Sequence, residues 1–176
     1  MQELAQSLTE AEAEQLECVI HQHLPIFHTE HCVFCRFLSD GNSYLDCGHP
    51  CEAKQVHLRD EHGKDHLVLA DMGCRNTVFN AQAQSGAYYL HHLMAVGFRH
   101  FRVELVDEPA EVVAGVLQQY AALAAGDATP KQVWAWVSQL PDANGNVGGV
   151  SGGSLETHHE RDKKSMRAPG TPTSAH

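Results

Sequence analysis

The fold class is decided by residues 100–106, which read HFRVELV. Successive side chains of this segment would point to opposite faces of a strand, and the two faces differ in their residues. A helix is expected before this strand, over residues 81–96, because small and apolar residues recur there at helical spacing up to the stop signal Gly97. A second helix is expected from Pro109, a residue suited to a first helical turn, to about residue 124. This helix-strand-helix order predicts an α/β protein.

The N-terminal part should contribute a short helix and a strand. Thr9 and Glu12 have the spacing of a capping box, which predicts a helix over residues 10–16. Residues 18–27 are rich in apolar and β-compatible types and predict one strand. Pro25 has no backbone N–H to donate, so pairing should end or bulge there.

The middle of the chain should combine an irregular loop with a hairpin. Residues 37–53 contain many turn formers and two cysteines, which predicts an irregular, cysteine-rich loop. Residues 55–59 and 66–70 flank a turn-like segment and predict a β-hairpin. A last helix is expected over residues 131–140.

Length and composition set the broad class. The chain has 176 residues, of which 43% are hydrophobic, enough for one domain, expected over residues 1–155. Residues 156–176 are too polar to offset their ordering entropy and should be disordered. The sequence shows neither a secretory signal nor an apolar membrane span, which predicts a cytoplasmic protein. A net charge of -10 with 12 Lys and Arg offers no basic surface for nucleic acid.

Six cysteines are the main functional signal. A reducing cytosol disfavours disulfides, and five of the six lie between residues 32 and 74. Clustered thiolates are soft ligands that suit zinc and iron-sulfur centres. A zinc site would use Cys32-x-x-Cys35 together with Cys47-x-x-x-Cys51, and spacing alone leaves zinc and iron-sulfur open. Inert buried thiols explain Cys18 but not five cysteines crowded together.

Four ordered motifs carry a family resemblance. They are HTEHC at residues 28–32, DCGHPC at 46–51, LRDEHG at 58–63 and DMGCRNTVFN at 71–80. Together they resemble the collagenase-like peptidase family U32, over about residues 19–117. The resemblance implies a 4Fe-4S cluster held by Cys32, Cys47, Cys51 and Cys74, rather than a zinc site that includes Cys35.

The same resemblance implies a fold and a reaction. Family members have a larger TIM-barrel-like domain, and this chain is similar to its later part only. A partial barrel is therefore expected, which a second chain could complete. Better-studied relatives hydroxylate RNA bases or ubiquinone precursors without oxygen, with prephenate as hydroxyl source for the RNA enzymes. A collagenase-like peptidase and a non-catalytic, cluster-stabilised binding module are the alternatives.

Four charged residues are candidates for substrate binding. Glu30 and Arg75 adjoin cysteines, so either could orient a substrate carboxylate or tune the metal centre. Arg102 and Glu104 share one face of a strand that is expected to be central in the sheet. For this second pair a structural ion pair is the alternative. The substrate is expected to be RNA or a small aromatic molecule.

Overall fold

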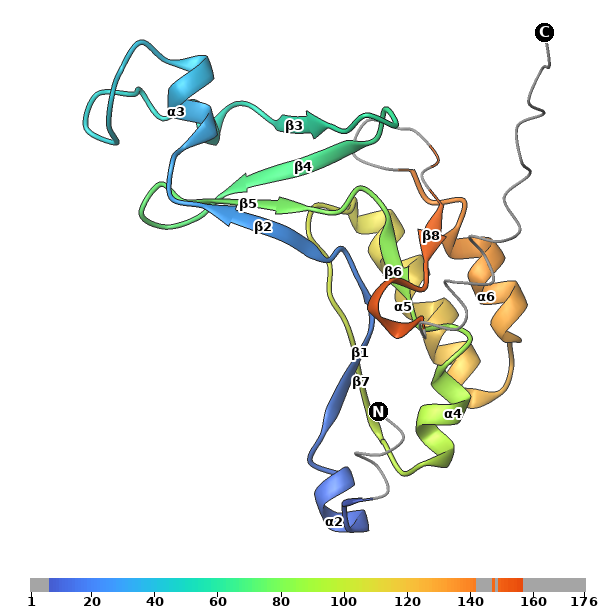
Figure 1. Ribbon diagram of the computed structural model, residues 1–176. Coiled ribbons are helices and arrows are strands. Elements are labelled where there is room, and N and C mark those ends of the chain that lie inside the picture. The colour runs from blue at the N-terminus through green and yellow to red at the C-terminus, as the bar shows by residue number, and fades with distance from the viewer. Residues whose placement is uncertain (1–6, 142–146, 148, 157–176) are drawn as a thin grey trace, which may run out of the picture.

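The computed structural model describes residues 7–141, 147 and 149–156. Its strands form two four-stranded sheets, called sheet A and sheet B, which extend in different directions (Figure 1). From edge to edge, sheet A consists of His100–Val103 (β7), Glu17–Gln22 (β1), Ala83–Ser85 (β6) and Val150–Ser151 (β8). Sheet A is mixed, because β1 pairs in parallel with β7 and antiparallel with β6.

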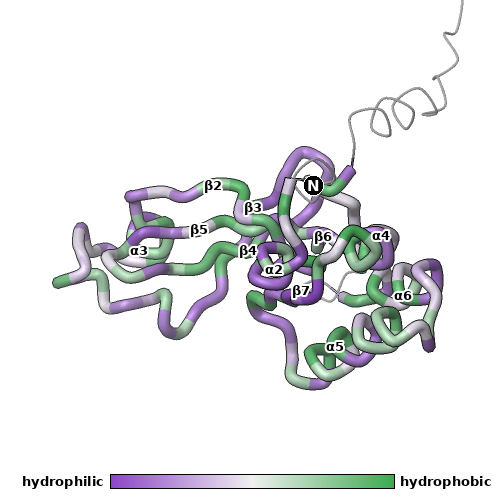
Figure 2. Tube along the Cα trace, turned by 90° about the horizontal axis from the view of Figure 1, so that it is seen from below, coloured by the Kyte–Doolittle hydropathy of each residue, from purple (hydrophilic) through white to green (hydrophobic). Residues whose placement is uncertain are grey.

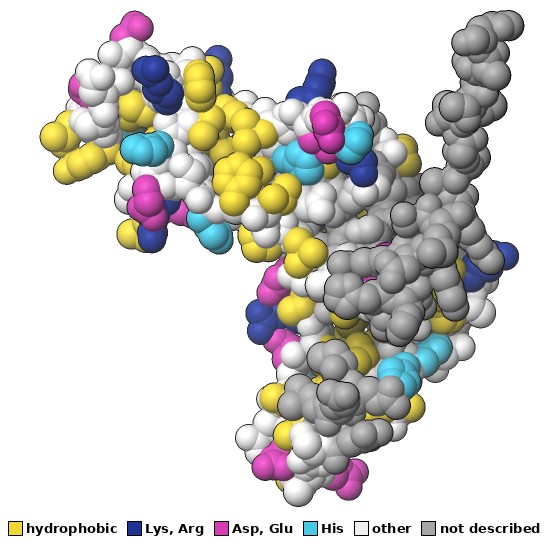
Figure 3. All heavy atoms as spheres, in the orientation of Figure 1, with side chains coloured by type: hydrophobic (Ala, Val, Ile, Leu, Met, Phe, Trp, Pro, Cys, Tyr) yellow, Lys and Arg dark blue, Asp and Glu magenta, His cyan; other side chains and the backbone are white. Residues whose placement is uncertain are grey.

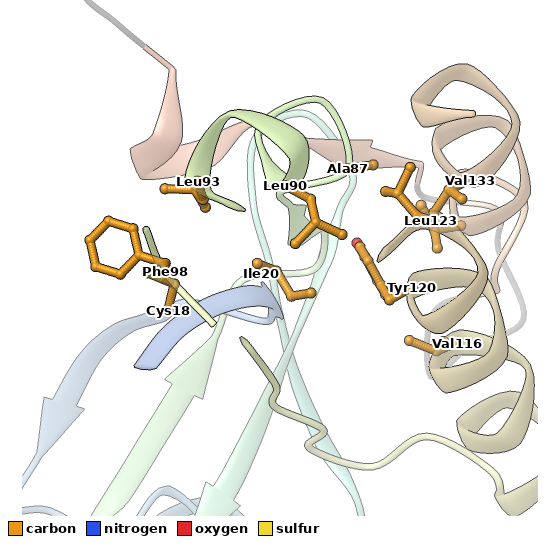
Figure 4. Packing of buried hydrophobic residues seen from close by; sticks show 11 residues of the cluster. Cys18, Ile20, Ala87, Leu90, Leu93, Phe98, Val116, Tyr120, Leu123 and Val133 are labelled. Atoms are coloured by element: carbon orange, nitrogen blue, oxygen red, sulfur yellow. The ribbon is translucent and has the colours of Figure 1, made fainter. Parts of the chain in front are cut away.

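Three helices cover sheet A and form the main core with it. They are Leu90–Ala95 (α4), Ala110–Ala125 (α5) and Pro130–Val137 (α6). Ile20 of β1 and the fully buried Leu90, Leu123 and Val133 of the helices belong to this core, which Figure 4 shows in close view. Burial of such side chains contributes about 1.5–3 kcal/mol each, so this half of the molecule carries most of the apolar stabilisation.

The contact between α5 and α6 depends on a glycine. A Cβ atom at Gly115 would lie 2.6 Å from Cη2 of Trp136, closer than two carbon atoms can approach. Gly115 therefore lets the indole ring of Trp136 rest against the α5 backbone. Thr129 caps the start of α6 through a capping box with Gln132.

Sheet B is antiparallel throughout. From edge to edge it consists of Pro25–Thr29 (β2), Asn76–Phe79 (β5), Asp65–Ala70 (β4) and Val56–Arg59 (β3). Its core is small, with Phe34 of helix Val33–Leu38 (α3) packed against Val68 and Val78. Sheet B and α3 extend away from α4, α5 and α6 (Figures 1 and 2). Figure 3 shows many apolar side chains on the visible surface of the part of the molecule that sheet B and α3 form.

Three short elements complete the fold. Glu10–Ala13 (α2) begins with the predicted capping box, in which Thr9 and Glu12 satisfy each other's backbone N–H groups. Pro50–Glu52 (η1) and Gly153–Leu155 (η2) are single 3-10 turns.

Several sequence predictions are confirmed. The protein is a mixed α/β protein, and α5 and α6 lie close to the predicted helices. The predicted hairpin is present as β3 and β4. Its turn is held by Asp60, whose side chain accepts the backbone N–H groups of His62 and Lys64 at 2.9 and 2.8 Å.

Three predictions for sheet A are wrong in part. The helix expected over residues 81–96 begins only at Leu90, because residues 83–85 pair with β1 and β8 as a buried strand, and this pairing overrides their helical spacing. The strand expected over residues 18–27 is divided between the two sheets, with Pro25 at the first position of β2, where its missing N–H is tolerated. The strand expected over residues 100–106 ends at Val103 and lies at an edge of sheet A, not at its centre.

The barrel expectation is not confirmed. Neither sheet closes into a barrel among the residues that the structure describes. Of the tail expected to be disordered, only Glu156 belongs to the described residues. The helices found in the described part of the chain are all too short or too polar to cross a membrane.

Candidate functional site: a thiol-rich end of sheet B

Five of the six cysteines lie in segments that meet at one end of sheet B. Antiparallel pairing directs β2 and β4 toward this end, and β3 and β5 start from it. We call it the thiol end, and it comprises residues 30–55 and 71–75, with α3 at its tip (Figure 1). Its cysteines are Cys32, Cys35, Cys47, Cys51 and Cys74. Cys18 is separate, buried in the main core.

The first two thiols are fixed by α3. Cys32 is the N-cap of this helix, and its sulfur accepts the backbone N–H of Cys35 at 3.4 Å. Phe34, only 2% exposed, anchors the helix on Val68 and Val78. The helix therefore holds Cys32 and Cys35 one turn apart, beside the small core of sheet B.

The loop after α3 turns back and brings Cys47 to Cys35. The thiol of Cys35 donates to the carbonyl oxygen of Gly41 at 3.5 Å. A Cβ at Gly41 would lie 2.5 Å from the carbonyl oxygen of Asp46 and 2.7 Å from Cα of Cys47, so only glycine allows this backbone crossing. Asp46 accepts two backbone N–H groups, those of Asn42 and Ser43, which lowers the pKa of its carboxyl.

Cys51 follows a tight change of chain direction. Gly48 and His49 both have left-handed backbone conformations, with φ of 67° and 52°. Pro50 then starts η1 and places Cys51 against the small core of sheet B, where Cys32 also packs. Two thiols from separate segments thus share one apolar support.

Cys74 lies in the turn between β4 and β5 and has an unusual backbone. Its φ is 61°, directly after Gly73 at 80°, and the turn is closed by the backbone N–H of Asp71 donating to the carbonyl of Arg75 at 2.7 Å. For a residue with a Cβ, the left-handed region costs about 1–2 kcal/mol. Such outliers are concentrated at functional sites.

Asn76 connects the Cys74 turn to the start of α3. Its Oδ1 accepts the backbone N–H of Val33 at 2.6 Å, and its Nδ2 donates to the carbonyl of Arg75 at 2.8 Å. Asn76 is fully buried and pairs across the sheet with Thr29. The segments that carry Cys32 and Cys74 are therefore tied together through one side chain.

The thiols influence one another. Partial burial raises the pKa of Cys35, and the thiols of Cys47 and Cys32 raise it further. Burial likewise raises the pKa of Cys51, with a contribution from Cys32. Cys35 and Cys51 thus each lie within electrostatic reach of Cys32 and Cys47. The connection to Cys74 runs through the backbone and Asn76.

The donor set suits a soft metal centre, although no site is preformed. All six cysteines are free, so the thiols are available as ligands. Within residues 7–141, 147 and 149–156, no three Cys, His, Asp or Glu side chains form a group that could hold a metal ion. Sulfur ligands match iron-sulfur and zinc by their softness, and binding would require these side chains to turn toward one another.

The four predicted substrate residues fall into two places. Glu30 and Arg75 are both exposed at the thiol end, and each lies one residue outside the last paired positions of β2 and β5, Thr29 and Asn76. Arg102 lies on the edge strand β7 and forms ion pairs with Glu17 and, at 3.0 Å, with Glu104. The structure thus shows the ion-pair alternative for Arg102 and Glu104, on a sheet without the clustered thiols.

The described part of the chain is a mixed α/β fold with free thiols collected at one end of an antiparallel sheet. The sequence profile of Peptidase family U32 matches residues 1–144, a range that includes all of sheet B and all of sheet A except β8. The chain therefore belongs to peptidase family U32. Searches of curated proteins and of solved structures returned no match.

Sequence reasoning overlooked Asn76 as an organising residue of the site. The available signal was the stretch Gly73-Cys74-Arg75-Asn76, in which a turn residue is followed within three positions by a side chain with both donor and acceptor groups. Helix α3 was also missed, because six residues are too few to show helical periodicity.

Proposed function

We propose that this chain is an iron-sulfur protein that takes part in the oxygen-independent hydroxylation of an RNA base or an aromatic metabolite. Its ligands would be Cys32, Cys47, Cys51 and Cys74, holding a 4Fe-4S cluster. The observation that supports the proposal is the gathering of free thiols from four chain segments at one end of sheet B. Membership of family U32 supports the same assignment.

The four proposed ligands come from segments with different supports. Cys32 is held as a helix cap, Cys51 rests on an apolar cluster, and Cys74 occupies a left-handed turn position. Cys47 lies in the loop that Gly41 folds back onto α3. A centre bound here would join the loop, the helix and the sheet, so metal binding and the order of this end should be coupled.

The surroundings suit a reaction on a polar substrate at the surface. Replacing a C–H hydrogen with hydroxyl from water releases two electrons and two protons, so that route needs an electron acceptor. A bound cluster would pass these electrons on one at a time, and a two-electron acceptor from outside the chain would have to take them up. The exposed Glu30 and Arg75 offer an acceptor and a cationic donor beside Cys32 and Cys74, where they could orient a substrate.

A zinc centre is the second candidate, and a specific observation favours it. Cys35 lies next to Cys47 and Cys32, whose thiols raise its pKa. A tetrahedral site from Cys32, Cys35, Cys47 and Cys51 would match this grouping and leave Cys74 free. The two candidates therefore differ in one ligand.

A matched pair of variants separates the two candidates. The iron-sulfur proposal predicts that Cys35→Ser retains iron and sulfide after anaerobic purification, whereas Cys74→Ser loses most of both. The zinc alternative predicts the reverse dependence, with stoichiometric zinc. For the reaction, RNA nucleosides and quinones from a deletion strain would be compared by mass spectrometry with those from the parent. A missing hydroxylated product that the wild-type gene restores supports the enzyme. Unchanged RNA and quinones argue against hydroxylation.

A further inference from the structure

A pocket lies between sheet B and the segment that joins β7 to α5. Its volume is about 270 Å³, and His23, Leu67 and Phe79 line it together with residues 106–109. Leu67 and Phe79 project from the face of sheet B opposite to Phe34, because alternate residues of a strand point to opposite faces. The pocket is at the far end of β5 from Cys74, and β5 itself, from Asn76 to Phe79, is roughly 10 Å long.

The pocket has apolar walls on two sides. Leu67 and Phe79 come from sheet B, and Val106 and Pro109 come from the connecting segment. Ligand pockets typically occupy about 300–1,000 Å³, so this one is near the lower limit. A single ring with one or two substituents fits such a space, and a nucleotide or a peptide does not.

The polar wall is dominated by carboxylates. Glu108 accepts the backbone N–H groups of Val106 and Asp107 through Oε2, at 2.6 and 3.1 Å. Its Oε1 is 3.4 Å from Nε2 of His23, whose Nδ1 donates to the carbonyl of Asn80 at 2.7 Å. These contacts lower the pKa of Glu108 to about 2 and raise the pKa of His23.

The other two carboxylates of the pocket, Asp65 and Asp107, differ in whether a positive charge lies beside them. Asp65 is held by a bidentate pair with Arg59, at 2.8 and 2.7 Å. Asp107, exposed at the pocket mouth, accepts the amide of Gln55 at 2.6 Å, and that amide carries no charge. Three carboxylates therefore face one permanent cation, Arg59, and one histidine, His23, so the charge of this group is negative in either protonation state of His23.

We propose that this pocket binds a planar, single-ring ligand that carries amidine-like or amino N–H donors and a positive or neutral charge. The apolar walls would sandwich the ring, and Asp107 would accept its N–H groups at the mouth. A ligand that carries a carboxylate or a phosphate would be repelled by the carboxylates of the pocket and would be excluded from it. This inference goes beyond the proposed function and needs no ligand at the thiol end.

Matched probes of equal size and opposite charge test the proposal. Benzamidine is a planar cation, benzamide is its neutral counterpart, and benzoate is the corresponding anion. Binding of each to the full-length protein would be measured by ligand-detected saturation-transfer NMR titration. We expect a roughly millimolar dissociation constant for benzamidine, as is usual for a ligand of so few atoms, and at least tenfold weaker binding of benzoate.

Two pocket variants and one control locate the binding. Asp107→Asn should weaken the binding of benzamidine about threefold, which is the scale of an exposed charge interaction. The variant should also reduce the ratio between the affinities for benzamidine and benzoate. Phe79→Ala should weaken all three probes. Asp127→Asn makes the same charge change beyond the other end of α5 and should leave every probe unaffected.

The proposal fails if benzoate binds as tightly as benzamidine, or if no probe binds at 20 mM. It also fails if Asp107→Asn and Asp127→Asn have equal effects on benzamidine. Iron content is measured on the same samples, so a failure of the pocket and a failure of the iron-sulfur proposal are recorded separately.

Discussion

The side chain of Asn76 accepts the backbone N–H of Val33 at 2.6 Å and thereby fastens α3 to the start of β5. This is a long-range contact between a fully buried side chain and the first residue of a short helix. It links the segment that carries Cys32 to the segment that carries Cys74. The thiol end is thus organised by a buried amide as well as by its cysteines.

Asn76→Ala should destabilise the protein by about 1–3 kcal/mol, because it leaves the backbone N–H of Val33 without its partner. The carbonyl of Arg75 would keep only the backbone N–H of Asp71. Urea unfolding followed by circular dichroism measures the change. Asn42→Ala, on the exposed loop of the same end, is the control and should change stability by less than about 0.5 kcal/mol. Equal effects of the two variants would contradict the role of Asn76.

The left-handed backbone of Cys74 gives a prediction that can be tested separately from the role of its thiol. In metal-free protein, Cys74→Gly should be more stable than Cys74→Ala by about 1 kcal/mol, because glycine adopts a φ of 61° without the steric cost of a Cβ. Both variants lack the thiol, so the comparison isolates backbone strain. Equal unfolding midpoints would show that this position is not strained in solution.

Gly115→Ala should destabilise the protein, against the usual preference for alanine in helices. Alanine normally gains about 1 kcal/mol over glycine there, but its Cβ would lie 2.6 Å from the ring of Trp136. Overpacking of this kind costs about 1–3 kcal/mol. Adding Trp136→Leu to Gly115→Ala should restore part of the loss. A higher melting temperature for the single variant would contradict the packing.

Acid should weaken the fold through His21. Burial, together with the nearby charge of His23, lowers the pKa of His21 from 6.5 to about 4 in the folded protein. Between these values the unfolded chain binds a proton that the folded chain does not, so stability falls as the pH drops from 6.5 to 4. The shift corresponds to about 3 kcal/mol.

Urea unfolding at several pH values measures this dependence. His21→Gln should show a shallower loss than the wild type, whereas His92→Gln, at an exposed position, should retain the wild-type slope. His21 also contacts the hydroxyl of Tyr120 at 3.2 Å, so the variant has a lower stability throughout, and only the slope is diagnostic.

The sequence was sufficient to predict elements whose signals are local. Thr9 with Glu12, the turn at Asp60, and Pro109 before α5 each determine a structure within a few residues. The sequence was insufficient where the secondary structure of a segment depends on partners that are distant in the chain. Residues 83–85 have helical spacing but form β6, because β1 and β8 provide ladder partners on both sides.

The candidate site, too, could be predicted from the sequence only in part. Clustering of cysteines predicted which residues belong together, and family resemblance selected four of them. The role of Asn76 and the closeness of Cys35 to Cys47 depend on how sheet B folds, and spacing contains no such information. The pocket at His23 and Glu108 combines sheet B with the segment that joins β7 to α5, so no single stretch of sequence could indicate it.

The most direct test of the central claim is the iron, sulfide and zinc content of the anaerobically purified protein. The account predicts about four iron and four sulfide per chain, with a broad absorption near roughly 400 nm that disappears in Cys74→Ser. A colourless protein with about one zinc per chain, unchanged in Cys74→Ser and lost in Cys35→Ser, would contradict it.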